Sequence, residues 1–308
     1  MNEKILLTGA NGFLGKFVKS ELIKAGFLPQ NISTPTKEEF DFTKFSDCQQ
    51  AVKNINIVIH LAAKVGGIGL NREKPGELFY DNLIMGIQLM ESARLAGVKK
   101  FVTIGTVCAY PKFTPVPFKE EDLWLGYPEE TNAPYGLAKK MLLVQAQAYR
   151  QQYGFNAIYL LPVNLYGPND NFDPSSSHVI PALIKKSIEA KNNNDPSVEV
   201  WGTGNASREF LYVEDAAKAI VAATLKYDQS DPVNIGSGTE ITIKDLVTTI
   251  NDLVDYKGKV VWDKSKPDGQ PRRCLDTSKA FKEFGFKAET NFKTGLKKTI
   301  DWYQSSLK

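Results

Sequence analysis

The chain has 308 residues, with 38 Lys or Arg against 35 Asp or Glu, and this mild net charge of +3 without a basic tract argues against nucleic acid as a partner. No apolar run approaches the roughly 18 residues of a membrane span, and Met1 to Lys4 leads straight into an expected strand, so we expect a soluble cytoplasmic protein with no membrane partner. Three scattered cysteines, Cys48, Cys108 and Cys274, argue against a disulfide framework or structural zinc, and no metal is indicated.

A glycine-rich turn lies close to the start of the chain. The short apolar run Lys4–Thr8 is followed at once by Gly9, Gly12 and Gly15, and then by a helical pattern through Ile23. Glycines at this spacing let the backbone turn tightly and approach a pyrophosphate, whose charge the N-terminus of the following helix receives. The order of strand, glycine turn and helix therefore predicts a dinucleotide site, with a merely structural turn as the alternative.

The residues after the second expected strand bear on which dinucleotide is bound. An acidic residue about twenty positions beyond the glycines would bind the ribose diol of NAD, but the sequence from Ser33 to Lys37 contains no acid. This absence, together with Lys37, favours the 2′-phosphate of NADP(H) and leaves NAD(H) possible. Asp41 lies where such a fold places an adenine contact, and Phe42 is either a further contact or a core residue.

Two further apolar runs indicate buried parallel strands. The first, Ile55–Ala63, contains His60, which we interpret as a core histidine rather than a catalyst. The second, Phe101–Gly105, delivers Thr106 and Cys108 to its carboxyl end. In open α/β sheets this edge is where ligands bind, so two potentially reactive side chains are expected there together.

Tyr135 and Lys139 stand four positions apart, after a loop rich in Pro and Glu that runs from Pro111 to Glu130. If a helix begins just after Pro134, both side chains lie on one helix face, and the lysine charge is expected to lower the phenol pKa from about 10. Tyr135 would then donate and accept protons at neutral pH. The alternative is a surface pair on an ordinary amphipathic helix.

The alternation of strands and helices predicts an α/β protein of the Rossmann type, with a doubly wound parallel sheet. We expect residues 1–165 to form an NAD(P)-binding domain, with a return segment near 208–238. Residues 166–308 are expected to form a smaller C-terminal α/β domain for the substrate, because polar loops separate shorter elements there. His178 precedes an expected helix, Val179 to Ile188, where it is a capping or packing residue or part of a site.

Together these motifs resemble the extended short-chain dehydrogenase/reductase superfamily and, within it, the GDP-L-fucose synthase family, over almost the whole chain. The signs of the superfamily are Gly9-x-x-Gly12-x-x-Gly15, His60-Leu61-Ala62-Ala63 and Tyr135-x-x-x-Lys139. The narrower signs agree in order and position: Ala63-Lys64-Val65-Gly66-Gly67-Ile68, Cys108-Ala109-Tyr110-Pro111, Asn164-Leu165-Tyr166-Gly167-Pro168, Asn171-Phe172-Asp173-Pro174 through His178-Val179-Ile180-Pro181, and Trp201-Gly202-Thr203-Gly204 through Arg208-Glu209-Phe210-Leu211.

The resemblance implies an NADP(H)-dependent enzyme that epimerises GDP-4-keto-6-deoxy-D-mannose at C3 and C5 and then reduces C4. It implies a reductase triad of Thr106, Tyr135 and Lys139. Thr106 stands where the family usually has serine, and it keeps a hydroxyl able to hydrogen-bond the substrate oxygen. Cys108 and His178 match the pair that moves protons at C3 and C5, where the neighbouring ketone makes the C–H groups acidic.

The resemblance also implies residues for binding. On the cofactor side these are Gly9, Asn11, Gly12, Phe13, Leu14, Gly15, Lys37, Asp41, Leu61, Ala62, Ala63, Tyr135, Lys139, Pro162, Asn164, Leu165 and His178. On the GDP-sugar side they are Lys186, Trp201, Arg208 and Lys266, with Lys185 as an alternative to Lys186. Asn11, Pro35 and Lys37 depart from the family, which often has arginines at these places.

The resemblance implies a quaternary structure as well. Helices expected over Asn82–Gly97 and Tyr135–Tyr153 lie on one side of the sheet, and in similar enzymes they pair with their symmetry mates, so we expect a homodimer. The alternatives in function are another nucleotide-sugar epimerase or reductase, of a keto-heptose or colitose pathway, an NAD-dependent 4-epimerase, or a non-catalytic dinucleotide-sensing protein. The proton-moving pair argues against a pure 4-epimerase or reductase, and the complete triad argues against a sensor.

Overall fold

The computed structural model describes residues 1–266 and 268–307. Its main sheet contains β1 (Ile5–Thr8), β2 (Ile32–Ser33), β3 (Ile57–His60), β4 (Lys100–Ile104), β5 (Ala157–Pro162) and β9 (Val233–Ile235). These six strands are parallel, in the order β2-β1-β3-β4-β5-β9. The chain thus winds outward in both directions from β1 and β3, which creates a switch point where ligands bind in such sheets.

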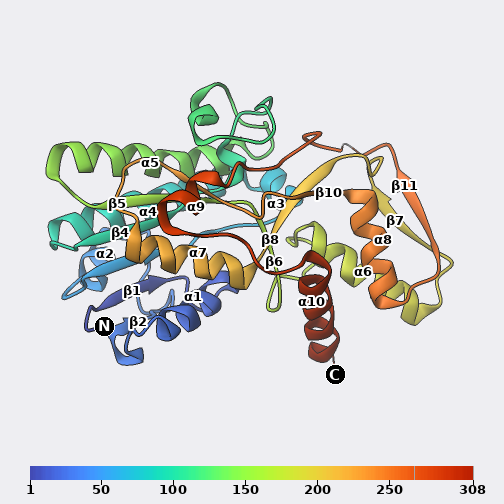
Figure 1. Ribbon diagram of the computed structural model, residues 1–308, viewed down its shortest axis with the longest axis horizontal. Coiled ribbons are helices and arrows are strands. Elements are labelled where there is room, and N and C mark those ends of the chain that lie inside the picture. The colour runs from blue at the N-terminus through green and yellow to red at the C-terminus, as the bar shows by residue number, and fades with distance from the viewer. Residues whose placement is uncertain (267, 308) are drawn as a thin grey trace.

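Helices cover both faces of this sheet (Figure 1). On one face α1 (Phe13–Lys24) packs against α7 (Val213–Lys226), and on the other α4 (Pro75–Leu95) packs against α2 (Phe45–Ala51) and α5 (Ala133–Tyr153). The predicted Rossmann-type α/β fold with a doubly wound parallel sheet is therefore confirmed. Since both faces are covered, β1, β3 and β4 are buried along their whole length, and most of their residues are apolar.

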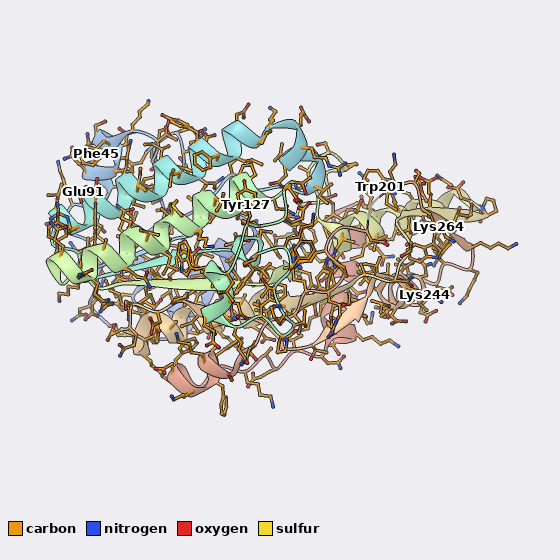
Figure 2. The ribbon with its side chains drawn as sticks, turned by 90° about the horizontal axis from the view of Figure 1, so that it is seen from above. Phe45, Glu91, Tyr127, Trp201, Lys244 and Lys264 are labelled. Carbon is orange, nitrogen blue, oxygen red and sulfur yellow. The ribbon has the colours of Figure 1, made fainter. Side chains whose placement is uncertain are left out.

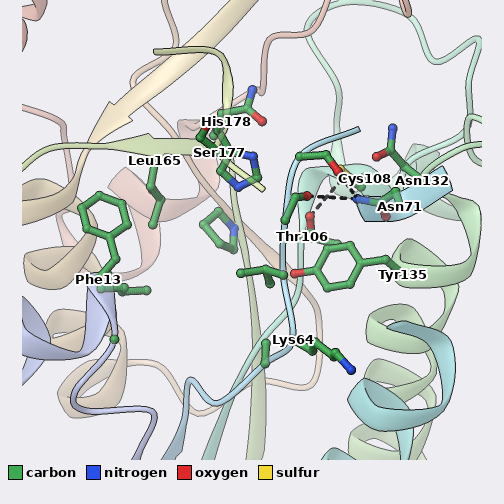
Figure 3. A pocket seen from close by; sticks show the side chains of 18 of the residues that line it. Phe13, Lys64, Asn71, Thr106, Cys108, Asn132, Tyr135, Leu165, Ser177 and His178 are labelled. Atoms are coloured by element: carbon green, nitrogen blue, oxygen red, sulfur yellow. Dashed lines mark hydrogen bonds between the residues drawn. The ribbon is translucent and has the colours of Figure 1, made fainter. Parts of the chain in front are cut away.

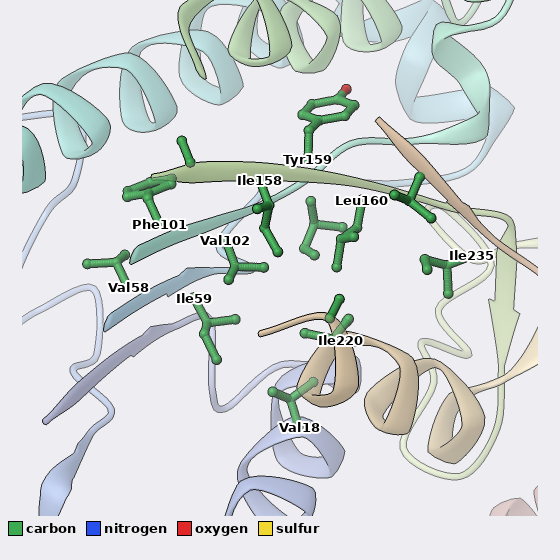
Figure 4. Close-up of a cluster of buried hydrophobic side chains, with 14 of the residues drawn as sticks. Val18, Val58, Ile59, Phe101, Val102, Ile158, Tyr159, Leu160, Ile220 and Ile235 are labelled. Carbon is green, nitrogen blue, oxygen red and sulfur yellow. The ribbon is translucent and has the colours of Figure 1, made fainter. Parts of the chain in front are cut away.

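The core explains how the main sheet fixes the helix that carries Tyr135. Figure 4 shows Val18 of α1 and Ile220 of α7 beneath the sheet, on the side to which Ile59 points, and these side chains are buried. Tyr159 of β5 points to the opposite face, where its hydroxyl donates a hydrogen bond to the carbonyl oxygen of Lys139 at 3.0 Å. A buried phenol thus ties α5 to the sheet at the turn that bears the lysine.

Smaller sheets form the remainder of the structure, at the other end of the molecule (Figure 1). One contains β6 (Asn164–Tyr166), β8 (Ser207–Tyr212) and β10 (Glu240–Thr242), and the other pairs β7 (Ser197–Trp201) with β11 (Lys259–Asp263). The helices are α3 (Ile68–Glu73), α6 (Val179–Asn193), α8 (Ile243–Val254), α9 (Ser278–Phe284) and α10 (Phe292–Ser306), and 3-10 turns occur at η1 (Pro29–Asn31), η2 (Val107–Ala109) and η3 (Glu120–Trp124). A second apolar cluster, including Ile184, Phe210, Leu246 and Leu296, lies among these elements.

Helix boundaries differ from those expected. Helix α4 begins at Pro75 rather than Asn82, because a proline at the first helical position already has a suitable φ angle. Helix α6 continues to Asn193, beyond Ile188, and ends where Asn194 adopts the left-handed conformation. None of the helices in the described part of the chain combines the length and apolar character needed to cross a membrane.

Candidate active site

A cavity of about 1250 Å³ lies at the carboxyl edge of the main sheet and extends toward the smaller sheets. Its walls come from the ends of β1, β3 and β4, the start of α5, and segments before α6 and around β7 and β8. Every predicted site residue borders it except Lys266. The cavity therefore brings together residues from both ends of the sequence, from Gly9 to Arg273.

The glycine turn forms a closely fitted cradle at one end of the cavity. Gly9 has φ +68°, and a Cβ on it would lie 2.8 Å from the backbone nitrogen of Ala62. A Cβ on Gly15 would meet the carbonyl oxygen of Gly9 at 2.1 Å, so the turn packs directly on α1. Among the residues that the structure describes, no side chain caps the N-terminus of α1, and the first turn of this helix carries no acid. Free N–H groups and the helix dipole therefore favour an anion here.

Lys37 and Asp41 border the same end of the cavity. Lys37 is exposed and belongs to a loop that contains no acid at the position expected of an NAD site. Asp41 accepts hydrogen bonds from the backbone nitrogen and hydroxyl of Thr43 at 3.1 and 2.7 Å, which lower its pKa. Its carboxylate thus stabilises the loop, while the charge of Lys37 stays available to an anionic group.

Thr106, Cys108 and Tyr135 meet in the middle of the cavity (Figure 3). Thr106 precedes the turn η2, and its Oγ1 accepts a hydrogen bond from the backbone nitrogen of Cys108 at 3.2 Å. Helix α5 approaches this turn closely because Gly136 has no side chain: a Cβ there would lie 2.4 Å from the carbonyl oxygen of Cys108. The glycine thereby sets the distance between the tyrosine and the cysteine.

Tyr135 and Lys139 both project from α5, but the predicted lowering of the Tyr135 pKa is wrong. Burial raises that pKa, the nearby Cys108 adds to the rise, and a hydrogen bond with Thr106 opposes it. The loss of water around the phenolate thus outweighs the hydrogen bond that favours it. Burial also lowers the pKa of Lys139 to about 8, and its side chain is 2% exposed. The alternative of a surface pair is therefore wrong too.

His178 lies at the N-terminus of α6 and borders the cavity on the side facing Thr106 and Cys108 (Figure 3). Its side chain makes no capping hydrogen bond. The ring stays accessible to solvent from the cavity, yet the walls displace enough water to lower its pKa and favour neutral imidazole. The segment before it is anchored across the cavity, because the backbone nitrogen of Gly67 donates to the carbonyl oxygen of Ser176 at 2.9 Å.

The predicted substrate residues lie at the far end of the cavity. Arg208 donates to the carbonyl oxygens of Ser207 and Asp268 at 2.7 and 3.0 Å, and burial lowers its pKa to about 10. Trp201 is 56% exposed and offers a flat face. Lys266 is not among the described residues that border the cavity, but its Nζ lies 5.5 Å from the centre of the Trp201 ring. Lys186 borders the cavity and donates to the carbonyl oxygen of Glu199 at 3.2 Å.

Sequence reasoning missed Arg273 and Gln270, which also border the cavity. The Nη1 atom of Arg273 lies 3.7 Å from the Sγ of Cys108. Both residues belong to a loop without periodicity, where charged and polar side chains usually face solvent. The only local signal was the position of that loop close to Lys266, and it does not distinguish Arg273 from its exposed neighbour Arg272.

His60 is buried in the core, as interpreted from the sequence. Its Nδ1 lies 2.9 Å from the hydroxyl oxygen of Thr8, and its Nε2 has no hydrogen-bond partner among the described residues. Burial lowers the pKa of His60 to about 3, and the nearby Lys139 contributes in the same direction. The imidazole is therefore neutral and only half satisfied.

Comparisons with known proteins agree with this geometry. The profile of the NAD dependent epimerase/dehydratase family matches residues 5–236. The protein named Probable GDP-L-fucose synthase 1, from Oryza sativa subsp. japonica, is 42% identical over 307 residues, which cover 99% of this chain and 93% of the relative. A GDP-6-OMe-4-keto-L-xylo-heptose reductase from C. jejuni has a similar structure, with a TM-score of 0.91, 29% identity, and 99% and 98% of the two chains covered. For a GDP-L-fucose synthetase from Naegleria fowleri bound to NADP the TM-score is 0.89 at 28% identity, with 100% and 95% covered. The chain therefore belongs to the NAD dependent epimerase/dehydratase family, within the extended short-chain dehydrogenase/reductases that its motifs predicted.

Proposed function

We propose that this protein is a GDP-L-fucose synthase, which epimerises GDP-4-keto-6-deoxy-D-mannose at C3 and C5 and then reduces C4 with NADPH. The observation that carries the proposal is that one cavity holds two sets of groups: the hydroxyls and ammonium of Thr106, Tyr135 and Lys139, and the thiol and imidazole of Cys108 and His178. A reductase needs only the first set. The similarity to GDP-L-fucose synthases supports the same substrate and cofactor.

The cavity suits NADP(H) on structural grounds. The turn of Gly9, Gly12 and Gly15 at the uncapped start of α1 would hold the diphosphate of the cofactor, and Lys37, which borders the same end of the cavity, would pair with its 2′-phosphate. When bound, the nicotinamide cofactor supplies the hydride that C4 of the sugar accepts. We place the remaining cofactor contacts at Asn11, Phe13, Leu14, Asp41, Leu61, Ala62, Ala63, Pro162, Asn164 and Leu165, which border the same cavity.

In the epimerisations, Cys108 and His178 move protons at the carbons next to the ketone. As the thiolate, Cys108 takes a proton from carbon while the electron pair of the C–H bond moves onto the ketone oxygen as an enolate. His178 returns a proton from the other side of the cavity, which requires its imidazolium form for that step. Its lowered pKa makes this form a stronger proton donor than an imidazolium in water.

In the reduction, Tyr135 gives its proton to the oxygen at C4. Its raised pKa keeps the phenol protonated at neutral pH, which a donor requires. Thr106 hydrogen-bonds the same oxygen and Tyr135, and Lys139 supplies a buried positive charge near the phenol as the proton leaves. Lys186, Trp201, Arg208 and Lys266 are our proposed contacts to the GDP moiety, with the arginine on the diphosphate and the indole on the base.

The test is to incubate purified protein with GDP-4-keto-6-deoxy-D-mannose in deuterated water, with NADPH or NADH, and to examine the sugar by NMR. Deuterium at C3 and C5 of a GDP-L-fucose product is the expected result, with faster turnover for NADPH. The likeness to a GDP-heptose reductase favours one second candidate, a C4 reductase without epimerase activity. Reduction without deuterium incorporation would support that candidate and reduce Cys108 and His178 to structural roles.

We further propose a homodimer in the cytoplasm, with residues 1–165 and 208–238 as the cofactor domain and 166–308 otherwise as the substrate domain. Helices α4 and α5 lie side by side on an outer face of the molecule, where Figure 2 labels Glu91 of α4 and Phe45 of the neighbouring α2. The groove on this face is lined largely by apolar groups, among them Ile87, Met141 and Val144. A second copy would bury that surface. Sedimentation equilibrium showing only monomers at micromolar concentration would contradict this part of the proposal.

A further inference from the structure

The surroundings of Cys108 contain a cation that the proposed chemistry has not used. Arg273 directs its Nη1 toward the Sγ of Cys108 at 3.7 Å. The side chain of the cysteine is half-buried, whereas Arg273 is 9% exposed. A cation beside a cysteine is a setting that stabilises a thiolate in proteins, and a guanidinium at this distance can also donate a charge-assisted hydrogen bond to the sulfur.

Arg273 is buried without an acidic partner. Within residues 1–266 and 268–307, no Asp or Glu forms an ion pair with it, whereas the adjacent Arg272 pairs with Glu240 and is 59% exposed. A buried charge without a counter-ion is costly, so an anion that forms beside it is stabilised. The nearest anion that this chain can itself supply to Arg273 is the thiolate of Cys108.

Neutral groups hold the guanidinium in place. The Oε1 atom of Gln270 accepts hydrogen bonds from Nε and Nη2 of Arg273 at 3.2 and 3.1 Å. Gln270 in turn donates from Nε2 to the carbonyl oxygen of Lys112 at 2.8 Å. Because the amide orients the arginine without neutralising it, the positive charge remains available to the sulfur.

The backbone of the arginine is fixed from the other side by Glu209 of β8. The backbone nitrogen of Glu209 donates to the carbonyl oxygen of Arg273 at 3.0 Å, and its carboxylate accepts from the backbone nitrogen of Leu275 at 2.6 Å. The same carboxylate accepts from the backbone nitrogens of Ser237 and Gly238. The segment that carries Arg273 is therefore attached to the strand that carries Arg208.

We propose that Arg273 is the positioning residue that holds Cys108 as a thiolate ready to remove a proton from the substrate. The inference rests on the proposed epimerase function, in which the C–H bond breaks, the proton goes to Sγ and the electron pair moves to the ketone oxygen. Arg273 keeps its protons throughout and acts only through the cysteine. The other titratable groups facing this sulfur are Arg208 from β8, Tyr135 from α5 and His178 from the start of α6, and all three are retained in the variants below.

The experiment measures alkylation of Cys108 by iodoacetamide in the full chain from about pH 5 to 9, with labelled peptides identified by mass spectrometry. Cys48 and Cys274 are buried and serve as internal references. In Arg273→Gln we expect the rate at pH 7 to fall about tenfold and the midpoint of the pH profile to rise by about one unit, the effect of losing one charge-assisted hydrogen bond. Arg273→Lys should restore most of the rate, and Arg272→Gln, which removes an exposed charge, should match the unmodified protein.

An unchanged alkylation profile in Arg273→Gln would overturn the inference. If Arg273→Gln does not fold, Gln270→Met serves instead, because it leaves the charge of Arg273 in place but removes the amide that orients the guanidinium. An alkylation rate in Gln270→Met equal to that of the unmodified protein would also overturn the inference. A normal profile with a raised KM for the GDP-sugar would instead make Arg273 a substrate ligand. Alkylation needs no substrate. A protein that turns over no GDP-sugar but shows the expected profiles would refute the proposed function and leave standing only the effect of Arg273 on the sulfur of Cys108.

Discussion

Gly136→Ala tests whether the close approach of α5 to the cysteine turn sets the geometry of the site. The added Cβ would lie 2.4 Å from the carbonyl oxygen of Cys108, 2.9 Å from its carbonyl carbon and 3.3 Å from the backbone nitrogen of Ala109. All three contacts are to backbone, so no side chain can rotate away. Either the helix that carries Tyr135 or the turn that carries Cys108 must move.

The size of that movement follows from the contact distances. Ordinary van der Waals contact begins near 3.4 Å, so relief of the closest contact needs a shift of about 1 Å. A misplacement of about 1 Å between reacting groups costs on the order of 10²-fold in rate. Overpacking destabilises a protein by about 1–3 kcal/mol, and the better helix propensity of alanine offsets up to about 1 kcal/mol of this. The variant is therefore expected to fold and to lose most of its activity.

The assay is consumption of NADPH with GDP-4-keto-6-deoxy-D-mannose, together with deuterium incorporation at C3 and C5. Both should fall about a hundredfold in Gly136→Ala, because the shift separates Tyr135 from Thr106 and moves Cys108 as well. Gly76→Ala is the matched control, since Gly76 lies in the first turn of α4, where an added Cβ meets no atom within 4 Å. A folded Gly136→Ala protein with activity within about twofold of normal would refute the reasoning.

Three further predictions follow from the site and its surroundings. Cys108→Ser should abolish most of the deuterium incorporation measured by NMR, while the chain still binds and reduces a 4-keto sugar that needs no epimerisation. Tyr135→Phe should keep the deuterium incorporation and lose most of the reduction. Normal exchange in Cys108→Ser would end the assignment of the cysteine. Gly67→Ala places a Cβ 2.4 Å from the carbonyl oxygen of Ser177 and should displace the neighbouring His178. The rate of deuterium incorporation should then fall by about tenfold or more. An unchanged rate would show that the loop moves without disturbing the histidine. Burial lowers the pKa of His60 to about 3, whereas the histidine of the unfolded chain keeps its ordinary value of 6.5. Between pH 6.5 and 3 the unfolded chain therefore binds one more proton than the folded protein, and the free energy of unfolding falls as the pH drops through this range. Denaturant titrations should show that His60→Gln removes up to about 1.4 kcal/mol per pH unit of this slope, and equal slopes in the two proteins would contradict the burial argument.

The parts of the structure that could be predicted are those encoded over short distances along the chain. The apolar run before Gly9 and the glycine spacing specify a strand, a turn and a helix within the first 24 residues, and the observed β1 and α1 follow them. The spacing of Tyr135 and Lys139 likewise specifies one helix face. The start of α4 was missed although Pro75 supplied a signal, because the apolar periodicity becomes clear only farther along the helix.

The errors in the site arise where an effect depends on burial. Spacing indicated that Lys139 neighbours Tyr135, but the sign of the Tyr135 pKa shift depends on how much water the fold removes from the phenol. That quantity is set by β5, η2 and the cavity walls together, and none of them is visible in a five-residue motif. A raised pKa keeps the phenol protonated, so the proposed proton-donor role of the tyrosine now rests on a different physical reason.

Arg273 shows the same limit more sharply. It is adjacent in sequence to Arg272, and the two are chemically identical, yet one forms an exposed pair with Glu240 while the other lies against a cysteine 165 residues away. What separates them is the strand β8, whose Glu209 fixes the backbone of the loop and so decides which arginine faces the cavity. The reactive sulfur is thus prepared by a residue whose role exists only after two distant segments have met.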